Sequence, residues 1–496
     1  MTNKCAAETC FNIPEIILHI SAFVWKSDAG TLSYLSRTNR CAYLSLEQER
    51  SRIVSCLLEK THSLSLFLNR QLSKYEQISC RSLEIIGTPY SRSVSRELDA
   101  QSSLLSILNH IGKSQTLVAF GYRTYNHQEF LCTPPQIMAA LRASSGTLRS
   151  LNIMSHSCSW ESLLKSDFNE LRNLQLALIS SKSQTKCKSP FLQPAEFLIS
   201  SDLPRFLQSM RHLTNLVLSI HGFKAGILNM SNLHFPTLIA IDISASTAPL
   251  GLTQFVASHS ELLHLHLSFG ESFVPGPFLP QDLPKLRALK FSVENNRMFA
   301  TFLGRSHSES AEETCARRPN IQHISIDNLA YFQFLKDCIN PFGAQLRRLD
   351  LRCWDDQPVF RGEFYKMLKS FTALVELSMT IRGRRDIGAK NVIIQSISEL
   401  QNLLRSLKDC ASLRAIHLRD MVSKPLDVSD LKNLQLVPPS LQFISWESRD
   451  GKTTFRIIHN TETRSAHAVA CEVPPPPHDV VYDWTSKNTL RHLFSH

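Results

Sequence analysis

The stretch Leu346-Arg347-Arg348-Leu349-Asp350-Leu351 is a six-residue phrase that returns along the chain. Close copies begin at Leu238, Leu262 and Leu286, with a spacing of 24 residues (262 − 238 and 286 − 262). Looser copies begin at Leu148, Leu171, Leu213, Ile321, Leu374, Leu413 and Leu441, and weaker ones at Leu83 and Leu117. About a dozen copies with similar neighbours make chance recurrence a poor explanation, so the chain is built from repeats.

The phrase predicts a short strand, in which side chains alternate between two faces. Leu349 and Leu351 then point into a core, whereas Arg348, Asp350 and Arg352 point away from it. Helix-like stretches precede many of the phrases, at residues 104–108, 136–141, 206–210, 252–256, 364–368 and 403–407. A helix followed by a strand, repeated, predicts right-handed crossovers and a parallel sheet.

This period and leucine pattern resemble a leucine-rich repeat. The resemblance implies an α/β solenoid over residues 81–446, a horseshoe of parallel strands with helices on the convex side. One feature of the family is missing, because the usual Asn or Cys after the last strand leucine is absent. The strand residues expected to be almost fully buried are Leu265, Leu267, Leu289, Leu349, Leu351, Leu377 and Ile416.

Residues 11–55 read as a small helical unit. Pro14 stands where a first helical turn can start, and Ser27-Asp28-Ala29-Gly30 interrupts the pattern with helix-capping residues. Apolar residues at helical spacing lie on both sides of this break, at Ile16, Ile17, Ile20, Phe23 and Val24 and then at Leu32, Leu35, Tyr43 and Leu44.

This N-terminal unit resembles an F-box of the version abundant in fungal proteins. The resemblance implies three helices that dock on the Skp-family adaptor of a cullin–RING ubiquitin ligase. It assigns adaptor binding to Pro14, Ile16, Ile17, Ile20, Leu32 and Leu35. Two departures are visible: Asn12-Ile13 replaces the family's Leu-Pro, and Cys41-Ala42 replaces Arg and a large apolar residue. A helical cap that only closes the solenoid is the alternative.

Two further segments flank the repeats. Residues 56–80 are expected to form a helical linker or N-terminal cap. Residues 447–496 are expected to form a C-terminal cap, with a hairpin around Asp450-Gly451 and a tail.

Composition bounds the class of protein. A single core stops growing near ~250–300 residues, so 496 residues, 43% of them hydrophobic, fit a solenoid. The 13 scattered cysteines include no C-x-x-C pair, which argues against a disulfide framework and a zinc ribbon. No apolar run is long enough to cross a membrane, and no signal peptide is expected. The expected location is intracellular, in the cytoplasm or nucleus.

No enzyme motif is present, neither a phosphate loop nor G-x-G-x-x-G, H-E-x-x-H or G-x-S-x-G. We therefore expect no catalysis and no cofactor. His264, His266 and His323 fall on outward strand positions and could meet, but Lys290 lies between them and opposes a metal site. The basic clusters are short and lack interleaved aromatic residues, so nucleic-acid binding is not expected.

Together these features predict a substrate-recognition subunit of a ubiquitin ligase, which catalyses nothing itself. The alternative is a leucine-rich-repeat interaction scaffold with a degenerate F-box and no ligase role. Outward strand positions form the expected target-binding surface: His264, His266, Lys290, His323, Asp327, Arg348, Asp350, Arg352, Glu376 and Arg419. Because arginine suits bidentate capture of carboxylate or phosphate, the expected target is an acidic or phosphorylated segment.

Overall fold

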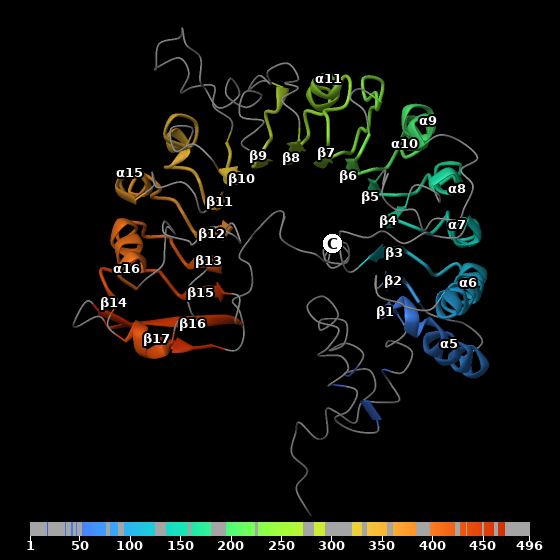
Figure 1. The fold of residues 1–496 in the computed structure, drawn as a ribbon, viewed down its shortest axis with the longest axis horizontal. Helices are drawn as coiled ribbons and strands as arrows, with labels where there is room; N and C mark the ends of the chain where they lie inside the picture. Colours follow the sequence, from blue (N-terminus) through green and yellow to red (C-terminus); the bar gives the residue numbers. More distant parts are fainter. Residues whose placement is uncertain are drawn as a thin grey trace, which may run out of the picture. The chain divides into compact units, whose positions relative to one another are not determined.

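The computed structural model contains two compact units, which divide between Leu238 and Ile239, except that Pro249–Gly251 belongs to the first. Figure 1 labels their helices and strands. The residues that it describes are 17, 35, 41, 42, 46, 52–75, 80–87, 94–124, 135–156, 160–179, 195–223, 227–270, 282–292, 320–329, 335–354, 361–382, 397–421, 427–432, 434–448, 451–460 and 465–471. Four of the predicted adaptor-binding residues, Pro14, Ile16, Ile20 and Leu32, lie outside these ranges.

The first unit is built on strands β1 to β6, each of which pairs in parallel with the next. The strands are β1 (Ile53–Leu57), β2 (Ser82–Gly87), β3 (Ala119–Thr124), β4 (Ser150–His156), β5 (Asn173–Ile179) and β6 (Asn215–His221). The helical segments are η2 (Leu58–Lys60), α5 (Thr61–Tyr75), α6 (Val94–Ser114), α7 (Pro135–Arg142), α8 (Trp160–Leu164), α9 (Ala195–Phe197), η4 (Leu198–Asp202) and α10 (Leu203–Gln208).

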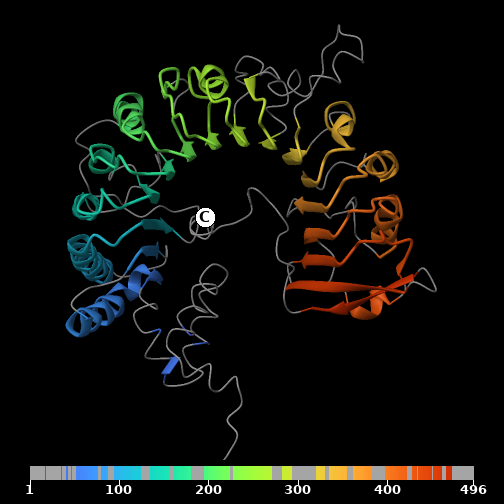
Figure 2. The same ribbon diagram turned by 180° about the vertical axis from the view of Figure 1, so that it is seen from behind.

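The second unit continues the pattern from β7 to β13 and then to β15, all in parallel. Its parallel strands are β7 (Ala240–Ala245), β8 (His264–Phe269), β9 (Ala288–Ser292), β10 (His323–Leu329), β11 (Arg348–Trp354), β12 (Glu376–Arg382), β13 (Ala415–Met421) and β15 (Phe443–Ser448). The helical segments between them are α11 (Leu252–Ala257), η7 (Leu335–Ile339), η8 (Asn340–Phe342), α15 (Arg361–Leu368), α16 (Ile397–Ser406) and η10 (Val428–Leu431). Figure 2, seen from behind, shows these helices along one side of the strands.

The strand leucines form the core between strands and helices. Leu349 lies in register with Ile324 on one side and Leu377 on the other, so equivalent apolar side chains of successive repeats pack against one another. All seven strand residues that the pattern predicted to be buried are at most 1% exposed. The parallel strands, their register and their buried leucines confirm the prediction of an α/β solenoid built from leucine-rich repeats.

Four strands run through the position where the family's Asn is missing. His156, His221, Trp354 and Met421 occupy that position, and each is the last residue of its strand. Strands β7 and β8 instead end one residue earlier, before Ser246 and Gly270. At the other end of the strands, side chains bind the carbonyl of the preceding repeat, as when Thr147 Oγ1 donates to Leu117 O at 2.8 Å.

Residues 56–80, where a helical linker or cap was predicted, contain the helix α5, and a strand crosses the boundary between residues 55 and 56. Ile53–Leu57 is a strand, which pairs in parallel with β2 from Ile53↔Ser82 to Leu57↔Ile86. Two β-branched residues favour a strand there, and the neighbouring repeat offers an edge to pair with. The solenoid thus begins one strand earlier than residue 81.

The C-terminal end of the second unit is antiparallel. Strands β15 and β16 (Gly451–Asn460) pair from Phe443↔Arg456 to Ser448↔Gly451, at the predicted hairpin. A further strand, β17 (Ser465–Ala470), pairs with β16 and with the short β14 (Leu434–Gln435), which the sequence did not indicate. Among the described helices, none is long and apolar enough to span a membrane.

Replacing Leu349 by Ala tests the shared core. The leucine is 0% exposed, so the cavity should lower the free energy of unfolding by about 2–5 kcal/mol. Leu436→Ala is the control, because Leu436 is 48% exposed and its loss should be almost neutral. Equal effects of the two substitutions, measured by chemical denaturation, would contradict the core assignment.

Candidate target-binding face

The side chains of the second unit's strands that do not enter the leucine core form one surface, which we call the polar face. It comprises the residues of β7 to β13 and β15 that alternate with the buried leucines. All ten residues of the predicted target-binding surface lie on it: His264 and His266 on β8, Lys290 on β9, His323 and Asp327 on β10, Arg348, Asp350 and Arg352 on β11, Glu376 on β12 and Arg419 on β13.

Strand register arranges these residues in rows that cross the strands. One row holds, in order, His264, Ala288, His323, Arg348 and Glu376. The next holds Asp242, His266, Lys290, Ser325, Asp350 and Ser378, and a third ends with Arg352, Thr380 and Arg419. Neighbours in a row are about 4.8 Å apart, which lets opposite charges on adjacent strands meet.

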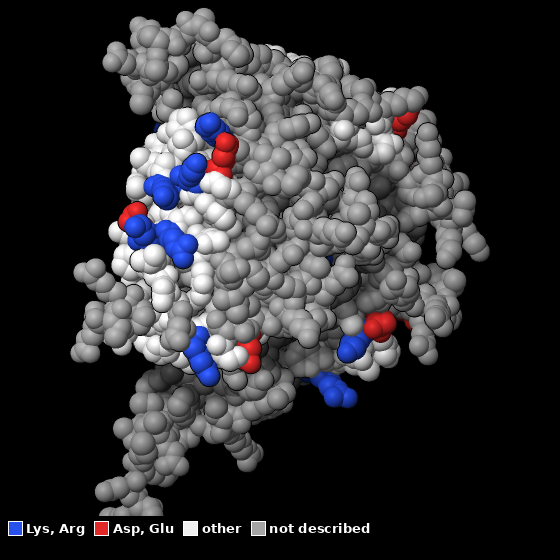
Figure 3. All heavy atoms as spheres, turned by 60° about the vertical axis from the view of Figure 1, so that its left-hand side comes forward, with Lys and Arg blue, Asp and Glu red and all other residues white. Residues whose placement is uncertain are grey.

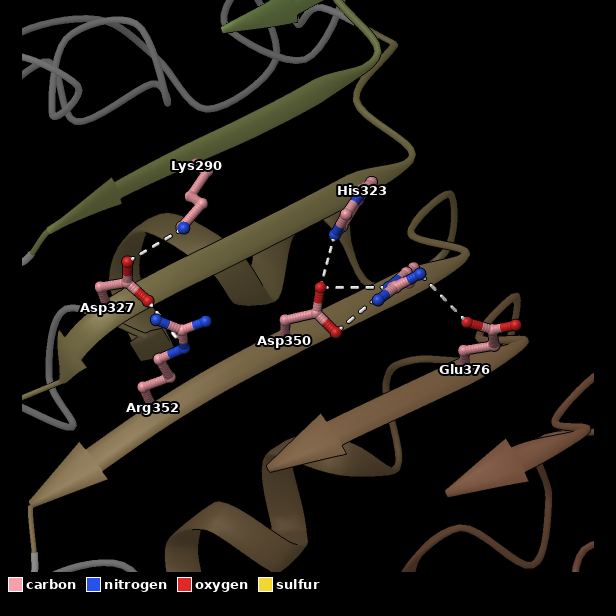
Figure 4. Close-up of polar contacts among 7 residues, drawn as sticks. Lys290, His323, Asp327, Asp350, Arg352 and Glu376 are labelled. Carbon is pink, nitrogen blue, oxygen red and sulfur yellow. Dashed lines mark hydrogen bonds and ion pairs between the residues drawn. The ribbon is translucent and has the colours of Figure 1, made fainter. Parts of the chain in front are cut away.

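Asp350 lies at the centre of a four-residue cluster (Figure 4). His323 Nε2 lies 2.7 Å from Asp350 Oδ2, and Arg348 Nε donates to both carboxylate oxygens at 3.1 Å. Arg348 Nη1 also lies 3.4 Å from Glu376 Oε2. The cluster joins β10, β11 and β12 through side chains that are 8–12% exposed.

Asp327 forms the centre of a second cluster, which joins strands β9, β10 and β11 (Figure 4). Its carboxylate lies 3.2 Å from Lys290 Nζ on β9 and 3.1 Å from Arg352 Nε on β11. On β8, His266 Nδ1 lies 2.7 Å from Asp242 Oδ1. The mixed charges of the polar face are therefore largely paired with one another.

Two buried groups on the polar face, Asp350 and His264, have pKa values below their ordinary ones. Burial by itself would raise the pKa of Asp350, but the charge of Arg348 and the hydrogen bond with His323 hold that pKa well below its usual range. Burial, aided by the nearby charges of His323 and Arg287, lowers the pKa of His264 to about 3. At neutral pH, Asp350 is thus an anion and His264 is neutral.

The three histidines do not come together as metal ligands. Within the part of the chain that the structure describes, no group of three or more His, Cys, Asp or Glu side chains is placed to hold a metal ion. His266 and His323 each face a carboxylate instead.

The arginines differ in how open they are to a partner. Arg348 is 12% exposed and lies between Asp350 and Glu376, so a target group would have to displace the chain's own carboxylates to bind it. Arg352 is 32% exposed, and Arg419 is partly exposed. The sequence predicted which residues share this face, but it did not predict that Arg348 would be bound internally.

The same face of the first unit is mostly uncharged. Its described ion pair is Arg123 Nε to Glu84 Oε1 at 2.7 Å. Amide and hydroxyl groups fill much of the rest, as where Asn215 Nδ2 donates to Asn173 Oδ1 and Ser219 Oγ lies 3.2 Å from His221 Nε2. Charge is therefore concentrated on the second unit's polar face.

In the N-terminal segment, the described residues form one small apolar core. Ile17, Ala42 and Leu46 are each 0% exposed, and Leu35 and Cys41 pack against them. Ile17 and Leu35 both lie in helices. Of the predicted adaptor-binding residues, Ile17 therefore supports the unit from inside, and Leu35 is partly open.

No family model matches the chain, and no curated protein matches it. One similar solved structure is a leucine-rich repeat-containing protein from Legionella pneumophila, LegL7, at 12% identity and a TM-score of 0.26, over 80% of this chain and 92% of that one. The repeat character of this chain is established by its own strand register and buried leucines.

Proposed function

We propose that this chain is the substrate-recognition subunit of a cullin–RING ubiquitin ligase. Its N-terminal helical unit would bind the Skp-family adaptor, and the polar face of the second unit would bind the target. Such a subunit acts by proximity, because it raises the effective concentration of a target lysine near a charged ubiquitin carrier.

The observation that carries the proposal is the pairing of a small helical core with a charged strand face in one chain. The core of Ile17, Ala42 and Leu46, with Leu35 against it, has the apolar packing that an F-box-like unit needs. The polar face presents many side chains from successive strands, a surface on which a partner can make several contacts at once.

The alternative is a leucine-rich-repeat scaffold that binds the same partners without a ligase. The departures Asn12-Ile13 and Cys41-Ala42 favour it, since they fall in the part of the motif that resembles the adaptor-binding sequence. Both functions use the polar face, and adaptor binding distinguishes them.

Arg352 and Arg419 are the residues that we expect to contact the target directly. Arg352 on β11 and Arg419 on β13 lie on either side of Thr380 on β12, so their main chains are about 10 Å apart. The side chain of Arg352 is more exposed to solvent than that of Arg348, and Arg419 is partly exposed. Arg352→Ala with Arg419→Ala should leave thermal stability and adaptor capture almost unchanged, because Arg352 forms a partly exposed ion pair. Capture of targets, measured by proximity labelling with a proteasome inhibitor present, should fall several-fold.

A matched control removes two positive charges from the helix side of the same unit. Lys366→Ala with Lys369→Ala alters exposed residues at the end of α15 and just after it. This pair should not change target capture. Retained capture by the Arg352/Arg419 variant would move the target site away from the polar face.

A further inference from the structure

Isolated arginines of the first unit form one row at the edge where its strands begin. The residue before a strand is Arg52 for β1, Arg81 for β2, Arg149 for β4 and Arg172 for β5. Their main chains are joined from repeat to repeat by N–H···O bonds of 2.7–2.8 Å: Arg81 N to Arg52 O, Val118 N to Arg81 O, Arg149 N to Val118 O and Arg172 N to Arg149 O. The row is therefore fixed by the sheet.

The turns and helix ends at this edge add further positive charge. We call the whole set the basic edge; its described basic residues are Arg52, Arg81, Lys113, Arg142, Arg149, Lys165, Arg172 and Arg211. The described acidic residues at the same edge are Glu161, Asp167 and Glu170. Most of these basic side chains are exposed, and the charge balance is strongly positive.

Part of this arrangement has a local structural role. Arg149 Nη1 donates to Gly146 O at 3.2 Å and lies 3.1 Å from Glu170 Oε2. Arg142 Nε donates to Ser166 Oγ at 3.0 Å. Within the row, Arg81 and Arg172 have exposed side chains. Only their main-chain atoms form the hydrogen bonds between repeats, so substitution of the side chains leaves these bonds in place.

The kind of partner follows from what the basic edge lacks. In the described part of the first unit, the large apolar side chains that are exposed are Leu66, Phe197 and Leu250, and none lies in the turns that lead into the strands. Protein interfaces are enriched in aromatic residues and methionine, whereas nucleic-acid interfaces are polar and positively charged. A membrane surface would also be expected to engage apolar side chains.

We propose that the basic edge binds the phosphate backbone of a nucleic-acid duplex, independently of base sequence. Arginines before four of the five strands β1 to β5 suit a polymer with a charge on every nucleotide, and guanidinium groups bind phosphate bidentately. Among the described residues of the edge, no Phe, Tyr or Trp is exposed on which a single-stranded base could stack. The sequence did not indicate this surface, because each arginine belongs to a different repeat.

The second unit also carries exposed basic residues, at Lys336, Lys366, Lys369, Arg405 and Lys408, with the acidic Glu363 and Asp409 exposed as well. Figure 3 shows more blue than red side chains over the part of the surface that it draws in colour. The two units differ in the residue that precedes each strand. In the second unit, Gln322 and Val375 separate Arg287, Arg347 and Arg414, whereas the first unit has adjacent arginine pairs, Arg52 with Arg81 and Arg149 with Arg172.

The test uses the full-length chain and a fluorescein-labelled DNA or RNA duplex of roughly 24 base pairs, with anisotropy measured between about 50 and 300 mM NaCl. Arg81→Glu with Arg172→Glu should weaken binding at least tenfold at low salt. The slope of log affinity against log salt should become shallower by about 0.9 for each phosphate that the variant no longer neutralises. Arg70→Glu with Arg205→Glu is the control, because it makes the same charge change on exposed residues of α5 and α10.

Duplex binding that survives in the control and fails in the edge variant supports the proposal. Equal loss in both variants overturns it, since binding would then follow net charge alone. Tighter binding to polyglutamate or to phosphatidylserine vesicles than to the duplex also overturns it, in favour of an acidic protein or a membrane. Circular dichroism of both variants verifies that they remain folded.

Discussion

Asp350→Ala is expected to lower the free energy of unfolding by about 3–5 kcal/mol. Asp350 accepts hydrogen bonds from Arg348 and is bonded to His323, and its side chain is 10% exposed. Its removal takes both of these hydrogen bonds from Arg348, whose Nη1 stays 3.4 Å from Glu376 Oε2, and takes the contact with Asp350 from His323. The cost arises because the buried guanidinium loses the carboxylate that accepts its hydrogen bonds at 3.1 Å.

An exposed ion pair between repeats of the same unit provides the control. Lys285 Nζ lies 2.6 Å from Glu261 Oε2, and both side chains are 55% exposed, so Glu261→Ala should cost no more than about 1 kcal/mol. Denaturant titration of both variants against the wild type measures the difference. Comparable small costs would contradict the view that the Asp350 cluster stabilises the polar face.

The pH dependence of the Asp350 effect has a definite sign. The folded-state pKa of Asp350 lies below its unfolded value, so its stabilising contribution is present above the unfolded pKa of about 4. The contribution falls as pH decreases through the folded value. The difference in stability between wild type and Asp350→Ala should therefore shrink as the pH falls below about 4.

Ile17→Asp is expected to abolish adaptor capture. Ile17 is 0% exposed within the small core that also holds Ala42 and Leu46. A carboxylate there would be buried without a partner, at a cost of several kcal/mol, which is enough to unfold a unit of this size. Co-purification with the Skp-family adaptor should drop to background, while the melting of the repeat units stays within about 2 °C of wild type.

Leu66→Asp introduces the same charge at an exposed apolar position, since Leu66 on α5 is 49% exposed. This control should keep adaptor capture. Capture that persists in Ile17→Asp would mean that the helical core plays no part in holding the adaptor.

Local sequence pattern was sufficient to predict the repeat. The leucine phrase specifies which strand residues are buried, because alternation within one strand decides it, and Leu349 and Leu351 follow the rule. It also placed Arg348, Asp350 and Glu376 on one face. Strand β1 was missed because its five residues lack the phrase, and pairing with β2 decides their conformation.

Contacts between repeats could not be predicted in the same way. Whether Arg348 meets Glu376 or Arg352 meets Asp327 depends on the register between strands, and the phrase spacing varies along the chain. The basic edge has the same origin, since Arg81 and Arg172 are brought into one row only by the ladder of the sheet. The arrangement of charge therefore depends on how successive repeats pair, which the sequence of a single repeat does not specify.

The most direct test of the central proposal is binding between the purified full-length chain and a purified Skp-family adaptor, measured by calorimetry and size-exclusion chromatography. The proposal predicts a one-to-one complex that also recruits the cullin scaffold and that Ile17→Asp does not form. A wild-type chain that is folded, yet shows no complex with the adaptor at micromolar concentrations, would contradict a ligase role and leave the interaction scaffold as the function of this protein.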